Sequence, residues 1–484
     1  MSTDQLEQMF ARQRSAFVAD GFPDAAIRRE RIDRLEAMLL DGRERLCDAL
    51  ALDYGTRPQA LSLVADVISG LNEMAYMQKN LERWMRPERP KPLARLAGVT
   101  MEAHPVPLGV VGIIGPWNFP LQLVAQPAAA ALAAGNRVML RPSSTTPRMT
   151  QVLAELAPRF FSADELVVVT KEIASGAEFA ALPFDHLFFT GSTATGKQIQ
   201  RAAAENLTPV TLELGGKNPA VVAPTADIDR AATRIGAARM VNSGQTCLSP
   251  DLAFVPVGHV ESFVDALIGS WRDRYPQVAD NDQYVSIIDE QQYRRVLDVL
   301  DDAAAKGATI RSAAPDGELL PAAASRKIAP TVVTGVTDAM RIADEEIFGP
   351  VLAVHSYEDI AEVIDYLGGR PSPLSSYWYG DDDHDFRRFF RSTRSGSVNR
   401  NDFGLVNAMH HLPFGGVGRS GMGSYHGKFG FDTFSHLRPI AAHGFPFSLA
   451  SIIATPYSPT MTKAIVRYAE QQRKAVTKRL ARHR

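Results

Sequence analysis

The sequence has little cysteine and almost no net charge. Only two of its 484 residues are cysteines, Cys47 and Cys247, so a framework of disulfide bridges is excluded. The 52 lysine and arginine residues nearly balance the 54 aspartate and glutamate residues, which gives a formal net charge of −2. This balance excludes an overall electrostatic attraction to nucleic acid or to an anionic membrane surface.

Long apolar runs are also missing. No stretch reaches the roughly 20 apolar residues that a membrane-spanning helix needs. Residues 119–135 are interrupted by prolines and glutamines, and residues 445–454 are too few. The early Asp4 and Glu7 do not fit a signal peptide. Together with the scarcity of cysteine, these absences predict a cytoplasmic protein without an integral membrane segment.

The chain is long enough for about three domains. Residues 1–85 show the apolar spacing of amphipathic helices, and a proline- and arginine-rich segment at 86–95 ends this region. Cys47 lies in such a helix, where we expect a small buried side chain. Residues 467–484 carry seven basic residues and one Glu, which fits a solvated helix, a frayed tail or a contact with an acidic surface.

Between these ends, strands and helices alternate in two successive runs. Alternation of this kind predicts right-handed βαβ units and parallel sheets, with ligands bound beyond the carboxyl ends of the strands. In the first run we expect strands at 108–114, 138–140, 166–170, 186–190 and 210–214, and helices at 121–134, 147–156 and 193–205. In the second run we expect strands at 220–223, 252–255, 351–355 and 375–379, and helices at 228–241, 261–273, 291–306, 359–367 and 383–392.

The motif Gly244-Gln245-Thr246-Cys247 follows a predicted helix and surrounds its cysteine with small and polar residues. A free thiol has a pKa near 8.5, so catalysis by Cys247 would need a nearby base or a field that stabilises the thiolate. There is no Cys-x-x-Cys motif and no Cys/His cluster, so we predict no metal site.

Glu213 is a candidate for that base. It ends a predicted strand just before Gly215 and Gly216, which permit a tight turn. Partial desolvation would raise its pKa toward the range useful for general-base catalysis. Taken alone, the same carboxylate fits an exposed strand end better than a catalytic role.

Four further motifs combine glycine or proline turns with polar or aromatic side chains. A strand–glycine–helix junction at 189–196 favours phosphate, although many helices begin in this way. In the loop after the first sheet strand, Asn118 is either a turn residue or an amide donor to an oxyanion. The segments 345–350 and 413–418 each place a phenylalanine beside a glycine turn, and either could be loop packing.

In this order and spacing, the motifs resemble the aldehyde dehydrogenase superfamily from about residue 10 to residue 440. The likeness is closest to its class 3-like branch and to the coniferyl aldehyde dehydrogenases within it. The segments that carry it are 109–118, 244–247 and 412–427, which read GVVGIIGPWN, GQTC and LPFGGVGRSGMGSYHG. The resemblance implies an α/β, aldehyde dehydrogenase-like fold, with a Rossmann-like cofactor domain, an α/β catalytic domain and a small oligomerisation arm.

The resemblance also implies domain boundaries. The cofactor-binding domain would comprise residues 1–98, 111–213 and 410–429, and the catalytic domain residues 214–409. Residues 99–110 and 430–445 would form the oligomerisation arm, and residues 446–484 a C-terminal tail. Members of the superfamily assemble through such arms, so a homodimer is expected.

The implied reaction is oxidation of an aldehyde to a carboxylic acid with NAD or NADP. Cys247 would attack the aldehyde to give a thiohemiacetal, and hydride loss would leave a thioester. Asn118 and the backbone N–H of Cys247 would hold the oxyanion, and Glu213 would activate the thiol, the hydrolytic water or both. The substrate would be aromatic, such as coniferaldehyde, or a medium- to long-chain aliphatic aldehyde.

The resemblance assigns other residues to the cofactor and the substrate. Phe414 would lie near the substrate funnel. Glu346 and Phe348 would position the nicotinamide ribose and ring. Further cofactor contacts would come from Trp117, Gly191, Ser192 and Gly196.

Two positions depart from the family pattern. Many relatives have Lys-Pro-Ser-Glu where this chain has Arg141-Pro142-Ser143-Ser144. Arg141 keeps the cation, whereas Ser144 removes a carboxylate that would repel a 2′-phosphate, so we expect NADP to be accepted or even preferred. Arg400 stands where relatives usually have an apolar residue, and it would lie either near the substrate mouth or on the surface.

Two alternatives use the same fold. An acyl-transferring member would pass the thioester to coenzyme A, but such members generally lack the glutamate that matches Glu213. A catalytically idle structural or binding protein would tend to lose the nucleophile or the base. The presence of Cys247, Glu213 and Asn118 therefore favours an enzyme that hydrolyses its thioester.

Overall fold

The computed structural model describes residues 2–89, 99–444, 446, 448 and 450–482. Within the proline- and arginine-rich segment 86–95, residues 90–95 thus lie outside the described residues. The chain forms two compact units, one of Met1–Arg86 with Pro105–Leu437 and one of Pro87–His104 with Arg438–Arg484. The division into cofactor domain, catalytic domain and arm stays a prediction.

The N-terminal region is helical, as its apolar spacing predicted. Ile32, Leu35 and Leu39 are fully buried on one face of its longest helix, α2. Cys47 is buried on the same helix, and burial raises the pKa of its thiol to about 11. The elements are α1 (Ser2–Asp20), α2 (Ala25–Tyr54), α3 (Gln59–Ser62), the π-helix η1 (Leu63–Ile68) and α4 (Ser69–Trp84).

The first alternating run forms a six-stranded sheet in the order β14-β6-β5-β2-β3-β4, parallel except for β14. All its predicted strands and helices are present, with ends shifted by a few residues. The strands are β2 (Val110–Ile114), β3 (Arg137–Arg141), β4 (Leu166–Val168), β5 (His186–Gly191), β6 (Val210–Leu214) and β14 (Gly421–Met422). The helices are α6 (Gln122–Ala134), α7 (Pro147–Phe160), α8 (Gly176–Ala180) and α9 (Thr193–Ala204).

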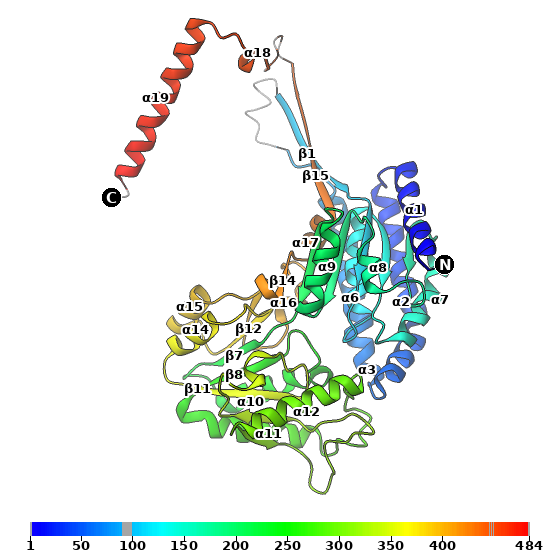
Figure 1. Cartoon of the computed structure of the whole chain (residues 1–484), viewed down its shortest axis with the longest axis vertical. Helices are drawn as coiled ribbons and strands as arrows, with labels where there is room; N and C mark the ends of the chain where they lie inside the picture. Colours follow the sequence, from blue (N-terminus) through cyan, green and yellow to red (C-terminus); the bar gives the residue numbers. More distant parts are fainter. Residues whose placement is uncertain (1, 90–98, 445, 447, 449, 483–484) are drawn as a thin grey trace. The chain divides into compact units, whose positions relative to one another are not determined.

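The second run forms a seven-stranded sheet in the order β13-β12-β7-β8-β11-β10-β9, in which only β9 is antiparallel to its neighbour. Helices α10 and α11 pack on one side of it (Figure 1). The strands are β7 (Asn218–Val222), β8 (Pro250–Pro256), β9 (Thr309–Ser312), β10 (Thr331–Thr334), β11 (Val351–Tyr357), β12 (Ser375–Tyr379) and β13 (Ser397–Arg400).

The helices of this run lie where they were predicted, with one boundary that was wrong. The predicted helix 228–241 ends at Arg239, because Asn242 and Ser243 adopt left-handed backbone angles. The helices and helical turns are α10 (Ile228–Arg239), η2 (Val241–Gly244), η3 (Val257–His259), α11 (Val260–Arg274), α12 (Glu290–Ala305), α13 (Arg341–Asp344), α14 (Ile360–Gly368), α15 (His384–Ser392), α16 (Leu405–Ala408), η4 (Gly418–Ser420) and α17 (Gly427–Thr433).

The sequence pattern missed the strands β9, β10 and β13. Each has four residues, and β9 and β13 read Thr-Ile-Arg-Ser and Ser-Val-Asn-Arg, without an apolar face. Strands this short carry almost no periodicity. Both polar strands lie at the edges of the sheet, where one side of the strand needs no partner.

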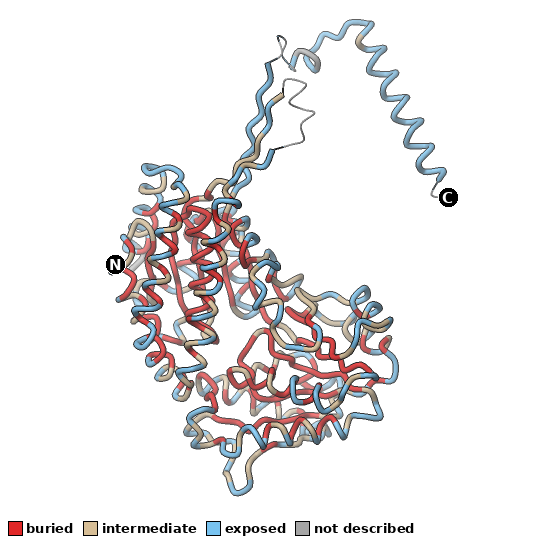
Figure 2. The backbone as a smooth tube through the Cα atoms, turned by 180° about the vertical axis from the view of Figure 1, so that it is seen from behind, coloured by how far each residue is buried: buried red, intermediate tan, exposed pale blue. Residues whose placement is uncertain are grey.

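The second unit contains most of two strands that pair with each other, β1 (Val99–Pro107) and β15 (Ser435–His443), and the helices α18 (Ala450–Ile453) and α19 (Pro459–Ala481). Figure 2 shows buried strands in the two large sheets but exposed residues along β15 and α19. The basic residues 467–479 therefore lie in an exposed helix, and a contact of this helix with an acidic surface stays a prediction. Among the described residues, no helix is both long and apolar enough to cross a membrane.

Candidate active site

Five of the predicted functional residues lie at the carboxyl ends of strands in the six-stranded sheet. Trp117 and Asn118 follow β2, Arg141 ends β3, Gly191 ends β5 and Glu213 lies near the end of β6. Since these strands are parallel neighbours, their carboxyl ends meet along one edge of the sheet. The sheet topology thus brings together residues that are up to about a hundred positions apart in the chain.

Cys247 and Glu213 share one cavity of about 280 Å³, hereafter the central cavity. Phe414, predicted to lie near the substrate, is also part of its wall. The lining is mostly apolar, which suits an organic ligand with a carbon skeleton. The other lining residues are Val64, Ala65, Ser69, Phe119, Gln122, Leu123, Thr190, Leu214, Val241, Thr246, Leu248, Leu374, Phe403, Gly404, Asn407 and Tyr425.

A strained turn leads the chain into Cys247. Asn242 and Ser243 have φ values of 53° and 52°, in the left-handed region that L residues rarely adopt. Gly244 follows with a φ of 77°, and a Cβ there would come within 2.1 Å of the Gly349 carbonyl oxygen. Only glycine fits this contact, so the backbone approach to Cys247 depends on Gly244.

Hydrogen bonds fix the peptide groups around Cys247. Asn218 donates from Nδ2 to the Cys247 carbonyl at 2.7 Å, and the Tyr377 hydroxyl donates to the Leu248 carbonyl at 2.6 Å. The buried Gln245 amide donates to the Asn242 carbonyl and accepts from the backbone N–H of Ile288. These contacts hold the thiol in one place at the cavity wall.

The thiol of Cys247 is protonated in the free protein. Burial raises its pKa to about 12, and the carboxylates of Glu346 and Glu213 add to this rise. The backbone N–H groups of Cys247 and Leu248 act in the opposite direction by donating toward the sulfur. Few thiolates form at neutral pH when the pKa of a thiol is raised in this way. Attack by Cys247 would therefore need a base, as the sequence predicted.

Glu213 is the base candidate inside the cavity. Its side chain is buried, and neither carboxyl oxygen has a hydrogen-bond partner among the described residues. Burial raises its pKa well above the usual 4.5. A buried carboxyl group without partners is costly to keep, which is typical of a group that binds a reactant or a water molecule.

Asn118 belongs to a buried hydrogen-bond network that we call the polar floor, made of Tyr54, Arg57, Asp66, Asn118 and Asn242. The Asn118 carbonyl accepts from the Tyr54 hydroxyl at 3.0 Å, from Arg57 at 3.0 Å and from Asn242 at 3.1 Å. Its side chain donates to the Gln245 carbonyl, two residues before Cys247, at 3.2 Å. An amide carries two N–H donors, so this bond leaves one for a ligand.

An ion pair without solvent contact supports the polar floor. Arg57 pairs with Asp66 at 2.7 Å, and both side chains are fully buried. The other Asp66 oxygen accepts from the backbone N–H groups of Leu121 and Gln122 at the start of α6. Sequence reasoning missed Arg57 and Asp66, because no motif marks them and they lie about 60 positions before Asn118.

A second pocket of about 210 Å³ contains Glu346. Burial raises the pKa of this carboxyl to about 8, while the backbone N–H of Gly216 donates to it. A Cβ at Gly215 would lie 2.3 Å from a Glu346 oxygen, so this glycine leaves room for the Glu346 carboxyl group. Two residues after Glu346, Phe348 has a φ of 49°. The centre of its ring lies 5.3 Å from that of the Trp117 ring.

The β5–α9 junction provides an open helix N-terminus beside the second pocket, which includes Thr193. Ser192 caps α9 by accepting from the Thr195 N–H at 3.2 Å. A Cβ at Gly196 would lie 2.8 Å from the Leu214 side chain, so this glycine permits close packing of helix and strand. The exposed first turn suits a phosphate group.

A third, smaller pocket is lined by Arg141 and Ser144 at the ends of β3 and β4. The Arg141 guanidinium is buried and donates to the Ala174 carbonyl at 3.1 Å, so its charge is partly used within the protein. Lys171 and Glu172 add one charge of each sign to the pocket. Together with the second pocket and the helix N-terminus between them, it fits an extended ligand with a phosphate at its centre.

Arg400 lies on the surface. It pairs with the exposed Asp382 at 3.5 Å and covers the Phe386 ring. The structure thus selects the surface position from the two that the sequence allowed.

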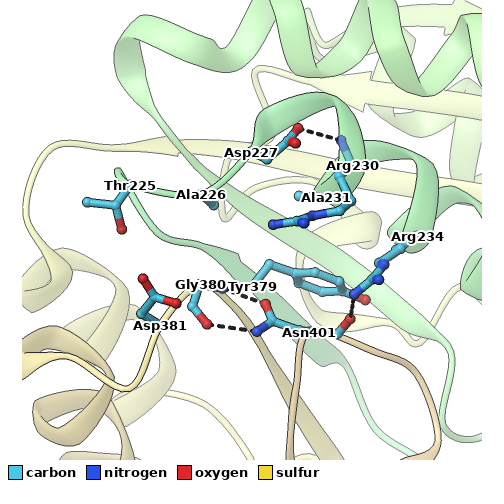
Figure 3. Close-up of a pocket in the computed structure, with 10 residues that line it drawn as sticks. All are labelled: Thr225, Ala226, Asp227, Arg230, Ala231, Arg234, Tyr379, Gly380, Asp381 and Asn401. Atoms are coloured by element: carbon cyan, nitrogen blue, oxygen red, sulfur yellow. Dashed lines mark hydrogen bonds between the residues drawn. The ribbon is translucent and has the colours of Figure 1, made fainter.

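A separate shallow pocket contains none of the predicted functional residues (Figure 3). Its Asp227 caps α10 by accepting from the Arg230 N–H, and Arg234 donates to the Asn401 carbonyl. With Asp381 the pocket carries two acidic and two basic side chains. Nothing in it resembles a nucleophile with a base.

Within the described ranges, no group of three or more His, Cys, Asp or Glu residues could hold a metal ion.

Comparison with known proteins gives consistent matches over nearly the whole chain. The model of the aldehyde dehydrogenase family matches residues 1–440. A coniferyl aldehyde dehydrogenase of Pseudomonas sp. (strain HR199 / DSM 7063) is 42% identical over 440 residues, which cover 91% of each protein. A dimeric NADP-preferring aldehyde dehydrogenase of Canis lupus familiaris is 34% identical over 95% of this chain and 99% of its own length.

Solved structures agree. The substrate-bound state of Staphylococcus aureus AldH matches with a TM-score of 0.87 at 32% identity, covering 96% of this chain and 99% of that chain.

Proposed function

Because this chain belongs to the aldehyde dehydrogenase family and is therefore an oxidoreductase that acts on aldehydes with NAD(P), we propose that Cys247 is its nucleophile and an aromatic aldehyde its preferred substrate. The observation that carries the proposal is the shared cavity, in which the Cys247 thiol and the unpartnered Glu213 carboxyl line one apolar space. A nucleophile beside a base of raised pKa is the arrangement that covalent catalysis needs.

Cys247 forms the bond to the substrate. Its sulfur attacks the carbonyl carbon while the thiol proton passes to Glu213 or to a water molecule beside it. The oxygen of the resulting thiohemiacetal lies near the free N–H of the Asn118 amide and the backbone N–H of Cys247. Donors held in place by the protein stabilise the developing negative charge without having to reorient.

Glu213 acts again when the thioester is cleaved, after it has released the thiol proton to solvent. Its carboxylate takes a proton from a water molecule that attacks the carbonyl carbon, and the thiolate of Cys247 leaves and is reprotonated. Because its pKa is raised, this carboxylate binds a proton more strongly than the carboxylate of an exposed glutamate. This role favours water over coenzyme A as the acceptor of the acyl group.

NAD(P), when bound, accepts the hydride that the thiohemiacetal loses. Arg141 and Ser144 would hold its adenosine end, Gly191, Ser192 and Gly196 its pyrophosphate, and Trp117, Glu346 and Phe348 its nicotinamide end. The exposed helix N-terminus at Ser192 supports this placement.

The pocket around Ser144 supports acceptance of NADP. Ser144 places no carboxylate there, and the cations of Arg141 and Lys171 outnumber the one carboxylate among the lining residues, that of Glu172. A relative named NADP-preferring supports the same proposal. We expect kcat/KM for NADP to be at least one tenth of the value for NAD. A more than tenfold higher kcat/KM with NAD than with NADP would reject the proposal that NADP is accepted.

An aromatic aldehyde of the size of coniferaldehyde suits the central cavity. Four aromatic side chains line it, Phe119, Phe403, Phe414 and Tyr425. Rings of this kind pack favourably against a flat aromatic substrate. The relative named coniferyl aldehyde dehydrogenase supports this choice. The wall residue Phe414 would then contact the ring of the substrate.

The proposal is tested by NAD(P)H absorbance with coniferaldehyde, benzaldehyde and hexanal, each with both cofactors. We expect the highest kcat/KM for coniferaldehyde and a free acid as the product. If turnover requires coenzyme A, the acyl group of the thioester passes to coenzyme A and not to water. Absence of turnover with every aldehyde would favour an idle protein on the same fold.

Two further properties belong to this proposal. We expect a homodimer, which the relative named dimeric supports, and sedimentation analysis tests it. We also expect a cytoplasmic location, since both cysteines are free thiols.

A further inference from the structure

Two walls of the central cavity come from distant parts of the chain. Val64, Ala65 and Ser69 belong to the π-helix η1 and the first residue of α4. Phe403, Gly404 and Asn407, from the segment around α16, form another part of the wall. The space available to a substrate therefore depends on how these two segments are held together.

Glu73 and His410 connect the two segments. Glu73 lies on α4 one turn after Ser69 and is fully buried. Its Oε2 lies at ion-pair distance from Nδ1 of His410, which follows Asn407 by three residues, although the two atoms do not have the geometry of a hydrogen bond. Its Oε1 accepts a hydrogen bond from the backbone N–H of Gly427 at 2.5 Å. One carboxylate thus binds both the cavity-wall segment and the start of α17.

The backbone around this contact is closely packed. Gly427 has a φ of 48°, and a Cβ there would lie 2.1 Å from the His410 carbonyl oxygen. The His410 ring also lies 6.0 Å from the Tyr76 ring on α4. The wall segment therefore contacts α4 and α17 with little room to shift while the Glu73–His410 contact is intact.

The same cluster supports Phe414. The His426 ring stacks on Phe414 at 5.0 Å with an angle of 20° between the planes. Burial lowers the pKa of His426 to about 4, so this ring is neutral at physiological pH. The centre of the His410 ring lies 6.3 Å from that of the His426 ring, and Gly427 directly follows His426 in the chain. A shift of the wall segment would thus also disturb the aromatic side of the cavity.

We propose that Glu73 and His410 form a clamp that holds residues 403–411 against α4 and thereby sets the size of aldehyde that reaches Cys247. The proposal rests on the proposed function of the central cavity. Glu73 and His410 are positioning residues. Without the imidazole, the buried carboxylate lacks a partner on the wall side, and admitting water there moves the wall outward.

The clamp is tested with His410→Ala, which removes the ring, and His410→Asn, whose amide nitrogen stands where Nδ1 was. For His410→Ala we expect KM for coniferaldehyde to rise about tenfold, as for the loss of one charge-assisted contact. We expect kcat to change less than about twofold, and KM for propanal, which is too small to touch both walls, to stay the same. His410→Asn should recover most of the lost affinity.

Lys428→Ala is the matched control. Lys428 lies beside Gly427 on α17 but forms an exposed pair with Asp432, away from the cavity. It should leave KM for all aldehydes unchanged. If His410→Ala proves unstable, Glu73→Gln replaces it, because a glutamine oxygen can still accept from Gly427 while the charge toward His410 is lost.

A readout independent of turnover is the alkylation rate of Cys247, followed by mass spectrometry. His410→Ala should speed the reaction with bulky N-phenylmaleimide several-fold and leave that with small iodoacetamide unchanged. Such a change without any aldehyde oxidation would support the clamp and reject the proposed function. A uniform fall in kcat for every aldehyde, with unchanged preference between the two reagents, would overturn the clamp.

Discussion

The buried polar groups on the two sides of Cys247 differ in their hydrogen bonding. On the side of Asn118, the polar floor joins Arg57, Asp66 and Asn242 in a network in which each side chain has hydrogen-bond partners. On the other side, Glu213 is equally buried, but neither of its oxygens has a partner within the described structure. Both sides place polar groups in an apolar interior. Only on the side of Asn118 do hydrogen bonds within the protein replace those that the groups would make to water.

The difference separates a scaffold from a reacting group. A satisfied network in a low-dielectric interior is rigid, so it can hold Asn118 in a fixed position. An unsatisfied carboxyl group keeps a raised pKa and free lone pairs, which a proton, a thiol or a water molecule can use. Changes on the polar floor should therefore mainly affect stability, and changes at Glu213 should mainly affect rate.

The largest effect is expected where the two sides meet. Cys247→Ser should lower kcat by at least about 10⁴-fold, because a hydroxyl is far less nucleophilic than a thiol beside the same base. Cofactor affinity, measured by fluorescence titration, should change little. Cys47→Ser is the control, since Cys47 is buried in α2 and does not line the central cavity, and it should keep most activity. Substantial turnover by Cys247→Ser would show that the two sides do not converge on this sulfur.

Arg57→Met disrupts the polar floor. It leaves Asp66 buried without its cation, which should lower the free energy of unfolding by about 3–5 kcal/mol in denaturant titrations. Adding Asp66→Asn removes the unpaired charge but keeps an acceptor for the N–H groups of Leu121 and Gln122. We expect the double variant to recover part of the loss. Equal stability of the single variant and the parent would contradict the role of a buried ion pair.

Glu213→Gln tests the reacting side. It should slow hydrolysis of the thioester by about 10²-fold, the usual contribution of a general base. Hydride transfer in the first turnover should be slowed less, so stopped-flow absorbance should show a burst of NAD(P)H followed by a slow steady state. If the first turnover is slowed as much as the later ones, Glu213 acts mainly on the thiol.

The smallest effect concerns stability and pH. Because the folded protein raises the pKa of Glu213 above its usual 4.5, this group opposes folding increasingly as pH rises through 4.5 toward the folded pKa. Glu213→Gln should therefore melt at about the same temperature as the parent at pH 4.5. At pH 8 it should melt about 2 °C higher. A lower melting temperature at pH 8 would mean that the ionised carboxylate has partners after all.

Local sequence patterns predicted much of the fold. The repeated change from strand to helix predicted every strand of the six-stranded sheet except the two-residue β14, because these strands are almost entirely buried and each stands beside a helix of clear period. It failed at β9 and β13, which are polar edge strands, and at the four-residue β10. The end of α10 was misplaced, because the left-handed angles of Asn242 and Ser243 serve the approach to Cys247 and not the helix.

The candidate site divides in the same way. The sequence by itself predicted which groups would supply the chemistry, since Cys247, Glu213 and Asn118 lie in glycine turns and at strand ends, in motifs that together resemble those of the family. Only the tertiary structure decided which groups hold them. Arg57, Asp66, Glu73 and His410 lie in no motif. Arg57, Asp66 and Glu73 matter because folding removes each of them from water beside one specific partner, which for Glu73 is the half-buried His410. Burial of a charge next to its partner is a property of the packed interior, which no short stretch of sequence contains.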